Sequence, residues 1–289
     1  MRLGEEGIIK RLVAAALDED KAGRDVTSQI LFGPRETTKG QIVHKGQEAV
    51  LCGLDFALGA FRAMDGGIKI KVLAREGERI KSMRTILHLE GRARAVLAAE
   101  RTALNFLCHL SGIATKTREF TVALGARKSP VISDTRKTHP MLRAAEKYAV
   151  AVGGGSPHRR DLAEMAMVKD NHLAALRRLH WSWHDRLSEA ARQLRERKIS
   201  VEIEVQNFSE LDAALWVNPD WIMLDNMAYA GLRRAVRHIR QKAPAVKIEV
   251  SGGVGLKDVK YLARLPIDRI SAGAIVHSAP FANFSLELL

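Results

Sequence analysis

Side chains able to do chemistry recur where short apolar runs of the second half of the sequence end. They are Asp134-Thr135-Arg136-Lys137, Lys169-Asp170-Asn171-His172, Glu204, Asp225-Asn226, Ser251-Gly252-Gly253 and Ser271-Ala272-Gly273. When the runs are parallel strands joined by helices, their carboxyl ends meet at one edge and build the site there. The sequence therefore predicts one functional site assembled from all of these positions.

The positive groups of this set predict an anionic ligand. They are Arg136, Lys137, His158, Arg159 and Lys169. So many cationic groups converge in one cavity only if anions neutralise them, because an unpaired buried charge is costly. Arginine suits a carboxylate because its planar fork donates two parallel hydrogen bonds, whereas lysine acts as a point charge. The predicted ligand is strongly anionic and carries carboxylate groups.

Two acids on neighbouring predicted strands, Glu204 and Asp225, suit a magnesium ion. Magnesium is commonly held by one or two carboxylates, by water and by substrate phosphates. The alternative is structural: these acids would form salt bridges to the arginines and lysines of the same rim. For Asp134 and Asp225 a further alternative is capping of the following helix.

The last two predicted strands end in small residues that suit a phosphate. Ser251, Gly252 and Gly253 follow one strand, and Ser271 and Gly273 follow the next. Glycine lets backbone N–H groups approach an anion closely, and this is the usual phosphate position in barrels of βα units. We therefore expect a phosphorylated ligand.

The elements that must position these residues form a regular alternation after residue 128. The predicted strands are 130–133, 164–168, 201–205, 221–224, 247–250 and 268–271, each followed by a segment of helix length. This order predicts a parallel sheet in an α/β fold. A His/Arg/Trp-rich segment, 177–186, is interpreted as a loop or an insertion.

The first third of the sequence has a different, mixed pattern. It predicts a helix at 5–17, strands at 40–45 and 48–52, a helix at 54–64 and further short strands to about 90. A long helix is expected from about 94, ending near Ser111-Gly112, where glycine can close it.

Composition excludes several classes of protein. The 289 residues contain no apolar run long enough to span a membrane, and the first twenty lack the pattern of a secretory signal, so we expect a cytoplasmic protein. Cys52 and Cys108 lack the spacing of a disulfide framework or a zinc site. The net charge of +13 is not gathered in a nucleic-acid motif, and only 5% of residues are aromatic, so no nucleic-acid partner is expected.

Several blocks of the sequence together resemble the quinolinate phosphoribosyltransferases, also called carboxylating nicotinate-nucleotide pyrophosphorylases. They are EDKAGRDVTS (19–28), ERTALNFLCHLSGIAT (100–115), DTRKTHPMLRAAEKYAVAVGGGSPHR (134–159), VKDNH (168–172), EIEV (202–205), IMLDN (222–226), EVSGGV (249–254) and ISAGAIVHS (270–278). The blocks occur in the family's order and run almost from end to end.

The resemblance implies an α/β protein with an N-terminal α/β sandwich domain and an open parallel α/β barrel. The corresponding domains are 1–112 and 113–277, with 278–289 packing back on the first. It also implies a homodimer whose active sites each receive Arg101 from the neighbouring subunit. The implied reaction joins quinolinate to phosphoribosyl pyrophosphate, with Mg²⁺, and yields nicotinate mononucleotide, carbon dioxide and pyrophosphate for NAD biosynthesis.

The resemblance also assigns residue roles. Arg101, Arg136, Lys137, His158, Arg159 and Lys169 correspond to the quinolinate pocket, Glu204 and Asp225 to the acids near magnesium and ribose, and Ser251, Gly252, Gly253, Ser271 and Gly273 to the 5-phosphate cradle. Lys137, Lys169, Glu204 and Asp225 are expected to serve the chemistry itself. Because no protein nucleophile is needed, they are expected to act through positioning and charge.

Two departures from the family pattern lie beside these positions. Met141 stands where the family usually has glycine, and Pro157 where it usually has asparagine. A non-glycine residue such as Met141 disfavours a positive φ, and Pro157 has no backbone N–H to donate and a fixed φ. We therefore expect the loop that presents His158 and Arg159 to differ in conformation from the family pattern. A related branch associated with molybdate-transport genes has a similar proline-histidine-arginine loop and is the nearest alternative. A non-catalytic, basic protein that binds anions or nucleic acid is the alternative of a different class.

Overall fold

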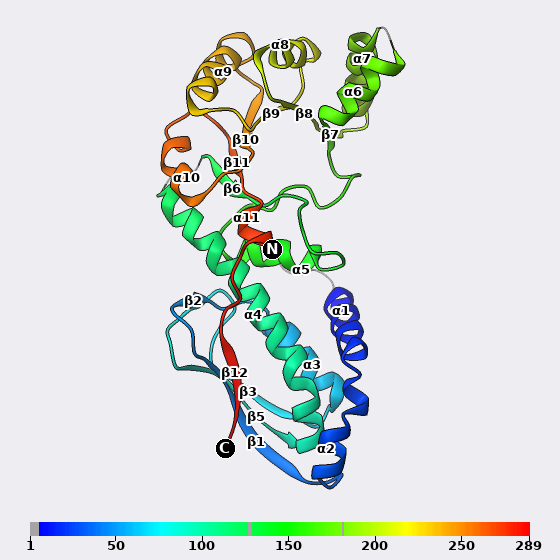
Figure 1. Cartoon of the computed structure of the whole chain (residues 1–289), viewed down its shortest axis with the longest axis vertical. Coiled ribbons are helices and arrows are strands. Elements are labelled where there is room, and N and C mark those ends of the chain that lie inside the picture. The colour runs from blue at the N-terminus through cyan, green and yellow to red at the C-terminus, as the bar shows by residue number, and fades with distance from the viewer. Residues whose placement is uncertain (1–5, 127–128, 181) are drawn as a thin grey trace. The chain divides into compact units, whose positions relative to one another are not determined.

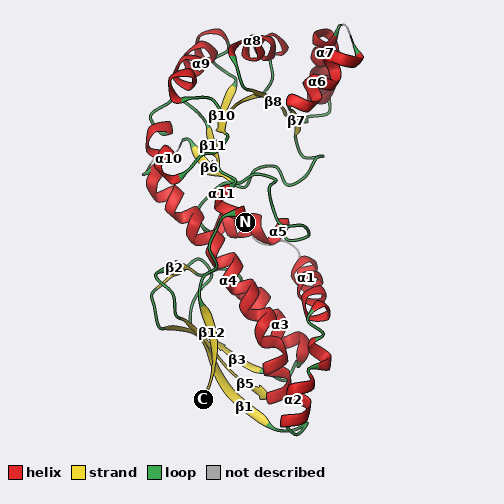
Figure 2. Ribbon diagram, viewed as in Figure 1, coloured by secondary structure: helices red, strands yellow, loops and turns green. Residues whose placement is uncertain are grey.

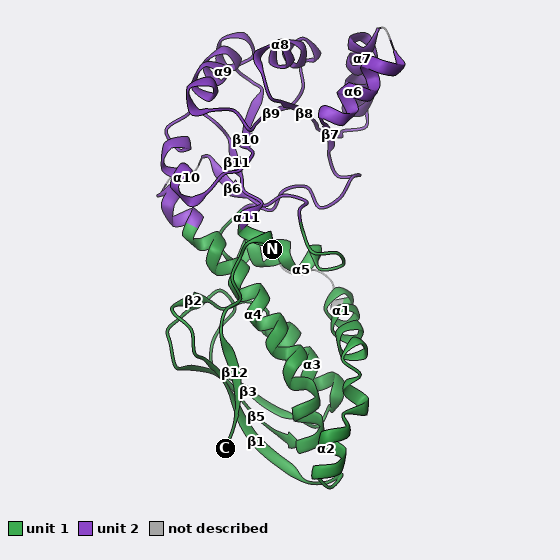
Figure 3. Ribbon diagram, in the orientation of Figure 1, with its two compact units in different colours: residues 1–119, 138–155, 275–289 green, residues 120–137, 156–274 purple. Residues whose placement is uncertain are grey.

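The computed structural model describes residues 6–126, 129–180 and 182–289, which divide into two compact units. Unit 1 takes residues 1–119, 138–155 and 275–289, and unit 2 takes residues 120–137 and 156–274 (Figure 3). The chain therefore passes from one unit to the other several times. Position 112, where the sequence suggested a boundary, lies inside a helix of unit 1.

Unit 1 contains a four-stranded antiparallel sheet in the order β12-β1-β5-β3. Its strands are Phe284–Leu288 (β12), Thr37–His44 (β1), Arg84–Arg92 (β5) and Lys69–Val72 (β3), and a separate pair joins Ala49–Val50 (β2) to Arg79–Ile80 (β4). The C-terminal strand β12 pairs with β1 along its whole length. The end of the chain thus completes the sheet that the N-terminal third begins.

The helices of unit 1 lie mainly in the N-terminal part of the chain. They are Glu6–Glu19 (α1), Val26–Leu31 (α2), Leu54–Met64 (α3), most of Ala93–Leu124 (α4) and Arg143–Val152 (α5), with a 3₁₀ turn at Ala22–Arg24 (η1) (Figure 1). Phe56 and Phe61 of α3 are fully buried, and Phe56 stacks on Phe106 of α4 with ring centroids 4.8 Å apart. Burial of such large side chains, each stabilising by roughly 1.5–3 kcal/mol, fixes α3 and α4 in the core.

The expectation that the long helix ends near Gly112 is wrong, because α4 continues to Leu124. Gly112 has a packing role instead. A Cβ added there would lie 2.1 Å from the carbonyl oxygen of Pro280, so only glycine admits the C-terminal segment against the helix. The helix ends where Gly125 adopts φ 79°, the left-handed conformation in which glycine commonly terminates helices.

Unit 2 contains an open six-stranded parallel sheet in the order β6-β11-β10-β9-β8-β7. The strands are Val131–Ser133 (β6), Ala166–Val168 (β7), Val201–Val205 (β8), Trp221–Asp225 (β9), Lys247–Ser251 (β10) and Arg269–Ser271 (β11). All six predicted strands are confirmed, as is the α/β fold with an incomplete parallel barrel. No described pairing joins the two end strands, β6 and β7.

Helices alternate with these strands and cover the sheet. They are Asp170–Leu179 (α6), Trp183–Glu196 (α7), Phe208–Val217 (α8), Tyr229–Lys242 (α9) and Leu256–Leu262 (α10), and Ala274–His277 (α11) follows β11. α8 packs against β8 and α9 (Figure 2). The polar face of α9 explains part of the positive charge, because Arg233, Arg234 and Arg237 are all exposed on it.

Most of segment 177–186 is helical, contrary to its interpretation as a loop. Its first residues end α6, and Trp183 begins α7, while Trp181 lies outside the described residues. The hydrophobic residues Leu187 and Ala191 of α7 are buried, and this apolar side explains the helix. Among the described helices, none is both long enough and apolar enough to cross a membrane.

Candidate active site

Strand register brings the predicted residues of unit 2 together. Met223 of β9 aligns with Glu204 of β8 and Glu249 of β10, and Asp225 aligns with Ser251. Side chains alternate between the two faces of a strand, so these side chains share one face of the sheet. They line a cavity of about 360 Å³ with Thr135, Arg136, Lys137, His158, Arg159, Met167 and Lys169. We call this space the strand-end cavity.

The basic side of the strand-end cavity is strongly constrained. Arg159 is only 9% exposed, and one of its guanidinium nitrogens, Nη1, donates to the carbonyl oxygen of Met165 at 2.7 Å. Burial and the nearby charge of Arg136 both lower the pKa of Arg159, because each disfavours the charged form. An anion in the cavity would relieve this repulsion, so the geometry favours an anionic ligand.

Lys169 and Glu204 form an ion pair between β7's end and β8. The backbone N–H of Lys169 also donates to Nδ1 of His172 at 3.0 Å, which holds the start of α6. The structural alternative for Glu204, a salt bridge to a basic residue of the rim, is thus present. Asp225 accepts a hydrogen bond of 2.6 Å from the side-chain amide of Asn226.

These two acids fit a hydrated divalent cation. Glu204 and Asp225 come from adjacent parallel strands, and both line the strand-end cavity. Their carboxylates are the hard oxygen ligands that Mg²⁺ prefers, and a shared open cavity leaves room for the waters that Mg²⁺ retains. The donor set is therefore suitable for magnesium held together with a phosphorylated substrate.

Asp134 does not cap a helix; it holds the loop that follows α5. Its side chain is fully buried, and its Oδ1 accepts the backbone N–H of His158 at 2.7 Å. The preceding residue, Pro157, has no N–H of its own to offer in this turn. Asp134 therefore fixes His158 and Arg159 at the wall of the cavity.

The predicted phosphate residues are only partly in the strand-end cavity. Ser251 lines it, whereas Gly252 lines a neighbouring cavity of about 390 Å³ together with Tyr229 and Tyr261. Gly253 has φ 61°, and Ser271, at the end of β11, is buried. Neither Gly253, Ser271 nor Gly273 is among the residues described as lining either cavity.

Arg101 belongs to unit 1 and lines a different cavity. It is exposed on α4, beside a space of about 450 Å³ that Asn105, His109 and His139 also line. Within the described part of the chain, Arg101 is absent from the lining of the strand-end cavity.

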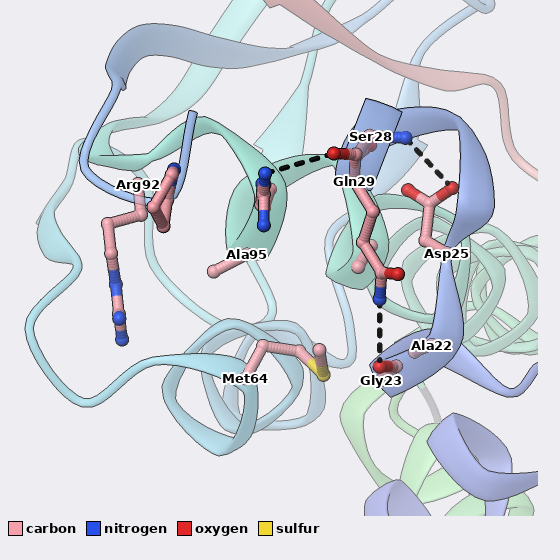
Figure 4. Close-up of a pocket in the computed structure, with 11 residues that line it drawn as sticks. Ala22, Gly23, Asp25, Ser28, Gln29, Met64, Arg92 and Ala95 are labelled. Atoms are coloured by element: carbon pink, nitrogen blue, oxygen red, sulfur yellow. Dashed lines mark hydrogen bonds between the residues drawn. The ribbon is translucent and has the colours of Figure 1, made fainter. Parts of the chain in front are cut away.

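A further cavity of unit 1, about 260 Å³, is a structural feature around η1 and α2. Asp25 caps α2 by accepting the N–H groups of Thr27 and Ser28, and Figure 4 shows its contact with Ser28. Arg94 donates to the carbonyl oxygens of Gln29 and Phe32. Several polar groups at both ends of α2 thus have hydrogen-bond partners within the protein. This explains the EDKAGRDVTS block as a capped turn.

Sequence reasoning missed three residues of the strand-end cavity, namely Met167, Met223 and Glu249. Each lies two positions before a residue that was identified, Lys169, Asp225 or Ser251. The period-two alternation of a strand would have found them, because positions i and i+2 point to the same face.

Comparison with known proteins agrees with this arrangement. Residues 25–111 match the family described as "Quinolinate phosphoribosyl transferase, N-terminal domain" and residues 113–287 match "Quinolinate phosphoribosyl transferase, C-terminal domain". The chain is 36% identical over 281 residues to the "Nicotinate-nucleotide pyrophosphorylase [carboxylating]" of Mycobacterium leprae, covering 96% of this chain and 95% of that one.

Solved structures give the same result. The nicotinate-nucleotide pyrophosphorylase from Francisella tularensis matches with a TM-score of 0.84 and 33% identity, covering 98% of this chain and 96% of that one. NadC from Streptococcus pyogenes matches with a TM-score of 0.84 and 35% identity, covering 97% of each chain. The chain therefore belongs to the quinolinate phosphoribosyltransferase family.

Proposed function

We propose that this chain is a quinolinate phosphoribosyltransferase that makes nicotinate mononucleotide for NAD biosynthesis. The observation that carries the proposal is the convergence of Arg136, Lys137, Arg159 and Lys169 on one cavity that is also lined by the carboxylates of Glu204, Asp225 and Glu249. A dicarboxylate and a phosphorylated sugar are anionic groups that suit a cavity wall with this many cations. Family membership supports the same activity.

The two carboxylates of quinolinate are assigned to the basic wall. Arg136 and Arg159 suit them because a guanidinium donates two parallel hydrogen bonds to a carboxylate. Lys137 and Lys169 add point charges that hold the ring in one orientation. His158 lies at the same wall, but Nδ1 of its ring accepts the backbone N–H of Arg159 at 2.7 Å, so it acts on the ligand through its neighbour.

The chemistry requires orientation and charge neutralisation rather than a protein nucleophile. The lone pair of the pyridine nitrogen forms a bond to C1 of the ribose while the bond from C1 to pyrophosphate breaks. The carboxylate beside the nitrogen then leaves as carbon dioxide, its bonding pair stays on the ring carbon, and a solvent proton completes the product. The positive ring nitrogen stabilises that carbanion, so holding the reactants in place supplies much of the rate.

Glu204 and Asp225 would hold magnesium at the cavity. When bound, magnesium would supply positive charge to the pyrophosphate of the substrate. Chelation by EDTA should then abolish turnover, and Glu204→Gln and Asp225→Asn should raise the magnesium concentration needed for half-maximal rate. Full activity in EDTA would contradict this assignment.

The 5-phosphate of the sugar is assigned to Ser251, Gly252, Gly253, Ser271 and Gly273. Gly252 and Gly253 both have positive φ, so successive backbone N–H groups can turn toward an anion. Substitutions that disturb these residues should weaken the binding of phosphoribosyl pyrophosphate more than the binding of quinolinate.

A homodimer with shared active sites would supply Arg101 from the neighbouring subunit. Arg101→Ala chains mixed with Lys169→Ala chains should then recover part of the activity, because each hybrid dimer can form one intact site. Absence of recovery in proven heterodimers would contradict the sharing. A cytoplasmic location is part of this proposal, and cell fractionation tests it.

The activity is tested by supplying purified protein with quinolinate, phosphoribosyl pyrophosphate and magnesium, with nicotinate in a parallel reaction. We expect nicotinate mononucleotide from quinolinate alone. No product from well-folded dimer would favour the molybdate-associated branch and another substrate, a reading that the Pro157 departure suggests. Tight, salt-sensitive binding of oligonucleotides without turnover would instead favour the non-catalytic alternative.

A further inference from the structure

Beneath the strand-end cavity, a buried cluster of charged side chains surrounds the ring of His158. Glu249 is fully buried on β10, and its Oε2 lies 3.0 Å from Nε2 of His158. Nη1 of Arg269 donates to the same carboxylate oxygen at 2.9 Å. The guanidinium of Arg269 also stacks on Trp221, 4.1 Å from the ring centroid. Residues of β9, β10 and β11 thus hold the Glu249 carboxylate against the His158 imidazole.

The hydrogen bonds of His158 determine which ring nitrogen carries the proton. Nδ1 accepts the backbone N–H of Arg159 at 2.7 Å, so it cannot itself carry a proton. In a neutral ring the proton is then on Nε2, which lies 3.0 Å from Oε2 of Glu249 and 3.2 Å from Nη1 of Arg269. Of these two groups only the carboxylate oxygen can accept the proton, so Nε2 donates to Glu249. Glu249 therefore fixes both the tautomer and the orientation of the ring.

This ring in turn fixes the backbone from which Arg159 projects. The N–H of Arg159 is held by the imidazole, and its Nη1 is held by the carbonyl of Met165 at 2.7 Å. Arg159 is therefore held both at its backbone and at its guanidinium. Glu249 contacts His158, and His158 contacts the backbone of Arg159, so Glu249 acts on Arg159 through the imidazole.

A second glutamate, Glu202, lies in the same cluster, but its Oε2 is 3.6 Å from Nε2 of His158, beyond hydrogen-bond distance. Both of its carboxyl oxygens are buried, and neither has a hydrogen-bond partner among the described residues. Burial and the neighbouring Glu249 raise the pKa of Glu202. Burial also acts to raise the pKa of Glu249, but the hydrogen bond with His158 and the charge of Arg269 outweigh it and lower that pKa. Glu249 is the ionised member of the pair.

We propose that Glu249, supported by Arg269, is a positioning residue that sets the Arg159 guanidinium for a substrate carboxylate through the imidazole of His158. This inference rests on the proposed function, because it assigns Arg159 to quinolinate. Glu249 touches no reacting atom in this account. Its charge keeps the imidazole turned so that Nδ1 faces the backbone of Arg159.

The test compares Glu249→Gln with Glu202→Gln, two substitutions of the same size in the same buried cluster. Glu249→Gln should raise the KM for quinolinate by about 10-fold or more, with the KM for phosphoribosyl pyrophosphate changed less than about 2-fold. Glu202→Gln should leave both constants within about 2-fold of wild type. Thermal melting of each variant verifies that folded protein is compared.

Glu249→Gln leaves the positive charge of Arg269 without the carboxylate that it faces. The double variant Glu249→Gln/Arg269→Gln removes both charges and therefore controls for this effect. It should show the same selective rise in the KM for quinolinate. In the wild type, nitrogen NMR of His158 should show a proton on Nε2 and none on Nδ1. The opposite tautomer would overturn the inference even if every variant failed to fold.

The outcomes separate this inference from the function on which it rests. A wild-type protein that does not turn over quinolinate contradicts the proposed function. A wild-type protein that does turn it over, with Glu249→Gln indistinguishable from Glu202→Gln, contradicts the positioning role alone. Equal rises in both Michaelis constants would also overturn it, because they would indicate general damage to the cavity.

Discussion

Gly252 and Asn226 approach each other so closely that a side chain on Gly252 cannot be accommodated. A Cβ added to Gly252 would lie 2.4 Å from the backbone nitrogen of Asn226, and the residue has φ 90°. The backbone N–H of Asn226 also donates to the carbonyl oxygen of Ser251 at 3.2 Å. The end of β10 and the end of β9 are thereby joined at the edge of the strand-end cavity.

We therefore expect Gly252→Ala to damage the proposed phosphate cradle. Both the clash and the positive φ should displace the loop, raising the KM for phosphoribosyl pyrophosphate about 10-fold or more. Gly253→Ala, in the same proposed cradle, adds strain at a positive φ without the clash, since no atom lies within 4 Å of its Cβ position, and so it isolates the effect of the clash. Its cost should be limited to roughly 1–2 kcal/mol of left-handed strain. Steady-state kinetics and urea unfolding of both variants measure the difference, and equal effects would contradict this account of the loop.

The departure at Met141 should reduce stability. Met141 adopts φ 66° and is 78% exposed, so its side chain gains little from packing. Left-handed strain in a non-glycine residue costs about 1–3 kcal/mol, and the greater freedom of an unfolded glycine offsets part of it. Met141→Gly should therefore raise the free energy of unfolding by roughly 1 kcal/mol. Met141→Ala keeps the Cβ and should give no gain; a loss of stability in Met141→Gly would refute the argument.

Glu146 should make unit 1 sensitive to acid. Its fully buried carboxylate accepts hydrogen bonds from His109 Nε2 at 2.8 Å and His139 Nδ1 at 2.6 Å. Burial acts to raise the pKa of Glu146, but these hydrogen bonds outweigh it and lower that pKa. A lowered folded-state pKa contributes stability above the unfolded value, near 4.3, and that stability is lost as pH falls through the folded value.

Urea unfolding as a function of pH measures this contribution. The wild type should lose stability as pH falls below about 4.3, and Glu146→Gln should be less stable at neutral pH with a flatter acid limb. Glu119→Gln is the control, because Glu119 is exposed and pairs only with Lys116 on the helix surface. Identical acid limbs in wild type and Glu146→Gln would show that this carboxylate does not set the acid response.

The sequence predicted the positions of the strands in unit 2 more successfully than the ends of the helices in unit 1. The alternating β-branched residues Val201, Ile203 and Val205 of β8 are buried, and such a pattern is easy to recognise in a sequence. Gly112 was misread because a glycine that permits close packing looks the same in sequence as one that ends a helix. The partner that decides between the two, Pro280, is far away in the chain.

The cluster under the cavity could not be predicted for a related reason. Glu202, Glu249 and Arg269 lie inside strands, where charged side chains are usually interpreted as facing solvent. Only the pairing of β10 with β11, which aligns Glu249 with Arg269, shows that these charges face each other. The two strands are separated in the chain by the helix α10, so the alternation of residues within either strand does not specify this register.

The assignment of the strand-end cavity to quinolinate is tested most directly by the kinetics of Arg136→Ala. Loss of a charge-assisted pair of hydrogen bonds, worth roughly 1.5–3 kcal/mol, should raise the KM for quinolinate about 10- to 100-fold. The KM for phosphoribosyl pyrophosphate should change far less. An unchanged KM for quinolinate in folded, active Arg136→Ala protein would contradict the claim that this cavity binds the pyridine dicarboxylate.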